Sequence, residues 1–69
     1  MNIKEFTVKE NAGFRLRIKS WKCANPADLN SMEFINEIKD KDGNVESTST
    51  YSFFMTDDEI KTLCEGLLK

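Results

Sequence analysis

Apolar and polar side chains alternate most regularly between residues 14 and 21. In FRLRIKSW the apolar residues hold every second position up to Ile18, and the basic residues lie between them. A period of two is typical of a β-strand with one buried face, because successive side chains point to opposite sides of a sheet. We therefore predict a strand with Leu16 and Ile18 on its core side. The other side carries Arg15, Arg17, Lys19 and Trp21.

Three other segments have strand-like patterns. Residues 3–9 place Phe6 and Val8 on one face, and residues 32–39 place Met32 and Phe34 opposite a mostly charged face. Residues 45–56 are rich in Thr, Ser and aromatic side chains, which favour strands. The chain is therefore predicted to form four strands in succession.

Turn-forming residues separate these segments. ENAG precedes the basic strand, and Gly13 is expected to adopt a positive φ in a hairpin loop. Residues 22–31 contain the only proline and several Asn, Asp and Ser residues, so they are predicted to form a loop, with one helical turn near Pro26. Asp-Gly within residues 40–44 is a strong hairpin signal.

The last segment changes to a helical period. Thr56 with Glu59 three residues later is typical of a capping box, so a helix is predicted to begin at Asp57. An apolar stripe follows at helical spacing, made of Ile60, Leu63, Cys64 and Leu67. We predict one domain over residues 1–69 of the α+β class. It is a four-stranded antiparallel meander (β-β-β-β-α), with the C-terminal helix packed on the apolar face and Cys64 in the core.

Composition narrows the functional classes. A chain of 69 residues can bury only a small core. It has no apolar run near the roughly 18 residues that span a bilayer and no apolar leader at its start, so we expect a cytoplasmic protein without a membrane segment. It has no histidine, and its two cysteines lack CxxC spacing. We therefore expect no metal, no cofactor and no enzymatic activity.

Charge is distributed unevenly along the chain. Residues 1–22 hold six basic and two acidic side chains, whereas residues 23–69 hold four basic and ten acidic ones. Basic residues beside an aromatic one on an open sheet face are suited to single-stranded nucleic acid. The residues of that hypothesis are Arg15, Arg17, Lys19, Trp21 and Lys22. Two alternatives stay open: an acidic protein surface binds the basic strand, or Glu33 and Glu37 on the neighbouring strand neutralise it.

Phe54 adds an apolar element to the same face. If Tyr51, Phe53 and Met55 face the helix, Phe54 lies on the open side with Trp21 and Ile35. An exposed apolar patch on so small a domain favours association with another chain, and a homodimer is one way to cover it. The alternative is that the strand twists or bulges and buries both phenylalanines.

These observations favour a small non-catalytic binding protein. We expect it to dock on another protein through the open sheet face and the 22–31 loop, as an accessory regulator or inhibitor of the kind that phage and mobile elements encode. The predicted binding residues are Arg15, Arg17, Lys19, Trp21, Lys22 and Phe54. Single-stranded nucleic-acid binding is the alternative function.

Overall fold

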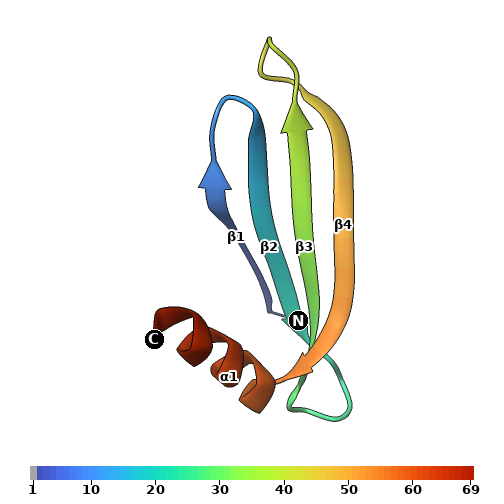
Figure 1. Cartoon of the computed structure of the whole chain (residues 1–69). Helices are drawn as coiled ribbons and strands as arrows, with labels where there is room; N and C mark the ends of the chain where they lie inside the picture. Colours follow the sequence, from blue (N-terminus) through green and yellow to red (C-terminus); the bar gives the residue numbers. More distant parts are fainter. Residues whose placement is uncertain (1) are drawn as a thin grey trace.

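The strands form one open sheet, and the helix follows them (Figure 1). The computed structural model of the chain describes residues 2–69. Its elements are β1 (Ile3–Glu10), β2 (Phe14–Lys22), β3 (Leu29–Lys39), β4 (Val45–Thr56) and α1 (Asp57–Leu68). The sheet order is β1-β2-β3-β4, with each neighbouring pair antiparallel. The predicted α+β meander with a C-terminal helix is confirmed.

The predicted 22–31 loop is shorter than expected. Lys22 and Trp21 pair in register with Asn30 and Ser31, and the Cys23 N–H donates to the Leu29 carbonyl oxygen at 2.8 Å. Only residues 23–28 therefore separate β2 from β3. Polar residues that are typical of loops lie inside β3 because the sheet satisfies their hydrogen bonds on both sides. The predicted helical turn is also absent from this segment, where the Leu29 N–H donates to the Pro26 carbonyl oxygen in a simple turn.

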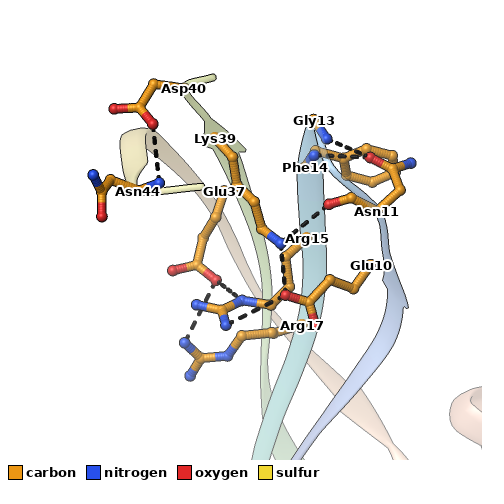
Figure 2. A network of polar contacts seen from close by, with 10 residues as sticks. All are labelled: Glu10, Asn11, Gly13, Phe14, Arg15, Arg17, Glu37, Lys39, Asp40 and Asn44. Carbon is orange, nitrogen blue, oxygen red and sulfur yellow. Dashed lines mark hydrogen bonds and ion pairs between the residues drawn. The ribbon is translucent and has the colours of Figure 1, made fainter. Parts of the chain in front are cut away.

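The two other connections are held by side chains. Gly13 is not at positive φ, so that prediction was wrong: the Asn11 Oδ1 atom accepts from the N–H groups of Gly13 at 2.8 Å and Phe14 at 3.0 Å (Figure 2). This side-chain turn replaces a left-handed backbone. Gly43, in the Asp-Gly turn, does have a positive φ of 85°. Glycine adopts that conformation without the steric cost that a Cβ atom would add.

The start of α1 is fixed by two sets of hydrogen bonds. Thr56 Oγ1 accepts from the Glu59 N–H at 3.2 Å, and Glu59 Oε1 accepts from the Thr56 N–H at 2.8 Å, which confirms the predicted capping box. The buried Asn30 amide donates to the Met55 carbonyl oxygen at 3.0 Å and to Asp57 Oδ1 at 2.9 Å. The hydrogen bond from Asn30 and the ammonium of Lys22 lower the pKa of Asp57. Together these contacts join the first turn of α1 to β3 and β4.

Removal of the cap tests how much this junction contributes. We expect Thr56→Ala to lower stability by about 1 kcal/mol, because the Glu59 N–H at the start of α1 loses its side-chain acceptor. Thermal unfolding followed by circular dichroism at 222 nm measures the change. Thr62→Ala, at an exposed position of the same helix, is the matched control and should be neutral or slightly stabilising, since alanine favours helices. Equal losses in both variants would contradict the role of the cap.

One face of the sheet carries the apolar side chains. The register places Ile18 beside Phe34 and Met32 beside Phe53, and the rings of Phe34 and Phe53 pack at 5.3 Å between centroids. Residues that pair across antiparallel strands point to the same side of the sheet. This side, which also faces α1, is called the groove face below, and the opposite side is called the open face.

The helix lies on the groove-face side but does not close over it. It contacts mainly the end of β4, and its C-terminal end lies out beyond β1 (Figure 1). Among residues 2–69, Met32 is the only buried apolar side chain, with 7% of its surface exposed. Cys64 is exposed, so its predicted place in a core was wrong. The apolar stripe of α1 faces the sheet across a gap and does not pack tightly on it.

Candidate binding surfaces

The charges of the open face are largely paired with one another. The register sets Arg15 opposite Glu37, and the Arg15 Nε atom donates to Glu37 Oε1 at 2.7 Å (Figure 2). The Arg17 Nη1 atom lies 3.7 Å from the same oxygen, and Glu37 is only 8% exposed. The hydrogen bond from Arg15 and the positive charges of both arginines lower the pKa of Glu37. One nearly buried carboxylate thus compensates two guanidinium groups.

Further ion pairs extend this network toward β1. Arg17 also pairs with Glu5, and Lys39 donates to Glu10 at 2.7 Å. The hydrogen bond from Lys39 lowers the pKa of Glu10. The alternative that acidic neighbours neutralise the basic strand therefore holds for Arg15 and Arg17 with Glu37. Glu33 lies opposite Lys19 in the register, but no ion pair joins Glu33 to a base within residues 2–69.

The structure brings together five of the six predicted binding residues. The alternation of β2 and the register with β4 put them on the open face: Arg15, Arg17, Lys19, Trp21 and Phe54. Lys22 lies on the groove face, where its ammonium pairs with Asp57. Lys22 therefore lies apart from the other five, because it follows Trp21 directly and successive strand residues point to opposite sides.

Apolar side chains replace the charges at one end of the open face. Ile3, Trp21, Ser31 and Phe54 lie opposite one another on the four strands, and we call these residues the Trp21 row. Ile3 is 53% exposed and Phe54 is 64% exposed, whereas Trp21 is half-buried. The alternative in which strand four buries both phenylalanines was therefore wrong.

The surroundings of the Trp21 row are polar. The Lys19 ammonium lies 5.8 Å from the centroid of the Trp21 ring, a cation–π geometry. The connection of residues 23–28 begins two residues after Trp21. The row is thus an apolar strip bordered by a lysine and a loop, at the edge of a face that is otherwise made of paired charges.

A groove on the other face was not predicted. It has a volume of about 880 Å³ and is lined mainly by apolar side chains of α1 and of the first three strands, with Asn2, Lys4, Ser20, Lys22, Asn30 and Asp57 among them. The lining residues include Phe6, Val8, Ile18, Met32, Ile60, Leu63 and Leu67.

The dimensions of the elements explain the groove. A helix of 12 residues is about 18 Å long and 10 Å wide. Strands of 9 to 12 residues, like β2 to β4, extend about 30 to 40 Å. One such helix cannot cover a four-stranded sheet of that length. The difference between the length of the helical segment and the lengths of the strand segments can be read from the sequence. It is the signal that could have predicted the groove.

Both cysteines lie within the described residues and are free thiols. Cys23 is a half-buried free thiol and Cys64 an exposed one. Within residues 2–69, no three His, Cys, Asp or Glu side chains are grouped as metal ligands would be. No helix in that range is long and apolar enough to cross a bilayer.

Comparisons with models of known protein families, with curated proteins and with solved structures gave no significant match.

Proposed function

We propose that this chain is a small non-catalytic binding protein, an accessory regulator or inhibitor that docks on another protein. The docking surface is the Trp21 row together with the 23–28 loop. The observation that carries the proposal is the exposure of Ile3 and Phe54 on either side of Trp21. Tryptophan and other aromatic residues dominate the energetics of protein interfaces, where they occupy a desolvated centre within a polar rim.

The paired charges favour a protein over nucleic acid. Arg15 and Arg17 already contact Glu37 and Glu5, so phosphate groups would have to displace these carboxylates. The chain also has a formal net charge of −2, which opposes long-range attraction of a polyanion. Lys19 is the base that borders the row and lacks an ion pair within residues 2–69. The partner surface is accordingly expected to be apolar at its centre, with an acidic group toward Lys19.

The decisive variant is Phe54→Glu. Phe54 is mostly exposed, so a charge there should leave the fold intact while it places a carboxylate within the proposed interface. The partner is first captured with the wild-type chain and purified. It is then titrated by calorimetry against the wild-type chain, Phe54→Glu and a control variant. We expect Phe54→Glu to weaken binding at least about 30-fold, as for an interface hot spot. Val45→Glu is the control, because Val45 is also exposed but lies at the other end of β4.

A second titration distinguishes a protein partner from single-stranded nucleic acid. Trp21 fluorescence is followed during titration with single-stranded DNA and RNA oligonucleotides at low and at moderate salt. A quench that weakens steeply with salt would replace the proposal with nucleic-acid binding. A protein partner that binds Phe54→Glu as tightly as the wild-type chain would show that the Trp21 row is not the interface.

A further inference from the structure

The single chain exposes more surface than a compact protein of its mass. Its accessible surface is 5306 Å², whereas a compact monomer of 8.0 kDa exposes about 4,450 Å². Its radius of gyration is 14.1 Å, against about 11 Å for a compact domain of 69 residues. The excess of about 850 Å² is close to the roughly 800 Å² that each partner contributes to a standard protein interface. The chain therefore has the area of one interface uncovered.

Much of this uncovered area is apolar and borders the groove. Phe6 and Val8 on β1, and Leu63 and Leu67 on α1, line the groove and are exposed, Leu67 by 76%. They belong to the two surfaces that would form a core if α1 lay against the sheet. Since α1 is too short to cover the sheet, a second apolar element is needed to complete this core.

The groove offers both parts of a self-complementary interface. It has a floor, the groove face of the sheet, and a ridge, the apolar stripe of α1. In a two-fold arrangement the ridge of each copy lies on the floor of the other, and both uncovered surfaces are buried together. A partner that supplied a ridge alone would leave the stripe of α1 at least partly exposed.

Charge complementarity also favours a second copy of this chain as the molecule that fills the groove. The helix carries four acidic residues and one basic residue over 57–68, a net charge of −3. On the groove face of β1, Lys4 and Lys9 make no ion pair within residues 2–69. An acidic helix from a second copy that lies across the floor would approach these two lysines. The groove thus matches the charge of its own helix.

We propose that two copies of this chain associate through the groove, with α1 of each copy packed on the groove face of the other. Ile3 and Phe54 of the Trp21 row point to the opposite side of the sheet, although Trp21 itself also borders the groove. The dimer therefore leaves Ile3 and Phe54 of both rows exposed, and the inference does not depend on the proposed function.

The oligomeric state and its response to one substitution test the proposal. Sedimentation equilibrium of the full chain should give twice the mass of 8.0 kDa. Leu67→Glu should raise the dissociation constant of the dimer about 100-fold or more, because a two-fold interface loses two buried leucines. Leu67 is mostly exposed in the single chain, so circular dichroism of the variant should show an unchanged fold. Val45→Glu, which lies outside the groove, is the matched control and should remain dimeric.

Cys64 reports whether the groove is the surface that is covered. In a Cys23→Ser background, Cys64 is the only thiol, and it faces the groove. Its reaction with a disulfide reagent should slow in proportion to the dimeric fraction as the protein concentration rises. A chain that stays at 8.0 kDa at high concentration would overturn the proposal. A dimer that forms with Leu67→Glu unimpaired, or with Cys64 fully reactive, would place the interface elsewhere and overturn it as well.

Discussion

Met32→Ala should lower the free energy of unfolding by about 2–3 kcal/mol, the lower part of the range for loss of a buried methionine side chain. Met32 lies on the inner strand β3 and is the one buried apolar side chain of residues 2–69. Its sulfur accepts a hydrogen bond from the Ser20 hydroxyl at 3.1 Å. A domain of this size rarely has more than about 3–5 kcal/mol of stability from its core. The variant is therefore expected to be substantially unfolded at 37 °C.

Urea denaturation measures the effect. With an m value of about 1 kcal/mol/M for a small domain, the midpoint should fall by about 2–3 M. Met32→Leu nearly conserves volume and should lose less than about 1.5 kcal/mol. All variants are compared at one protein concentration, because self-association would make the midpoint depend on concentration. A Met32→Ala midpoint equal to that of Met32→Leu would show that Met32 does not anchor the core.

Glu37→Gln should destabilise the protein at neutral pH and make its stability less sensitive to acid. The carboxylate of Glu37 compensates Arg15 and Arg17 from a nearly buried position, and a neutral amide cannot do so. Arg17 would keep only its pair with Glu5, and Arg15 only its 3.8 Å contact with Glu10. We expect a clear fall in the thermal midpoint at pH 7, because both guanidinium groups lose the nearly buried carboxylate that they share.

The pH dependence follows from the direction of the pKa shift. The folded-state pKa of Glu37 lies below the unfolded value of about 4.5, so the unfolded chain takes up the proton first as the pH falls. The stabilisation by Glu37 is therefore fully present above about pH 4.5 and is lost as the pH falls through the folded-state pKa. The gap between the midpoints of wild-type and Glu37→Gln should be constant from pH 7 to about pH 5 and should close below that.

Other carboxylates set the background for this measurement. The pKa values of Glu10 and Asp57 are lowered as well, so Glu37→Gln still loses some stability in acid. Glu46→Gln is the matched control, since Glu46 is exposed and makes no ion pair within residues 2–69. Its acid profile should follow that of the wild-type chain. A parallel profile for Glu37→Gln would refute the compensating role of this carboxylate.

The local elements of this fold could be predicted from the sequence. The period of two in residues 14–21, the Asp-Gly turn and the Thr56–Glu59 capping box all depend on residues a few positions apart. The strand, the turn and the helix start that they predict therefore do not depend on contacts with distant residues. The order of four strands and one helix followed from these signals, and β4 and α1 begin where the patterns placed them.

The extent of the 22–31 loop was mispredicted for a non-local reason. Asn30 looks like a loop residue in the sequence, but its amide bonds with Met55 and Asp57, which are more than 20 residues away. Such a partner makes a buried polar residue acceptable in a strand. Gly13 illustrates the same limit at short range, since the side chain of Asn11 made a left-handed glycine unnecessary.

The sequence by itself determined the strands, the helix, the two faces of the sheet and the charges available to each face. Only the tertiary structure decided how these were used: that Glu37 is shared by two arginines, that Ile3 joins Trp21 and Phe54 in one row, and that α1 stands off the sheet. The physical reason is that periodicity and capping act within a few residues, whereas register and helix packing depend on contacts between segments distant in the chain. The apolar stripe of α1 can be predicted from the sequence, but its exposure depends on where α1 lies relative to the sheet.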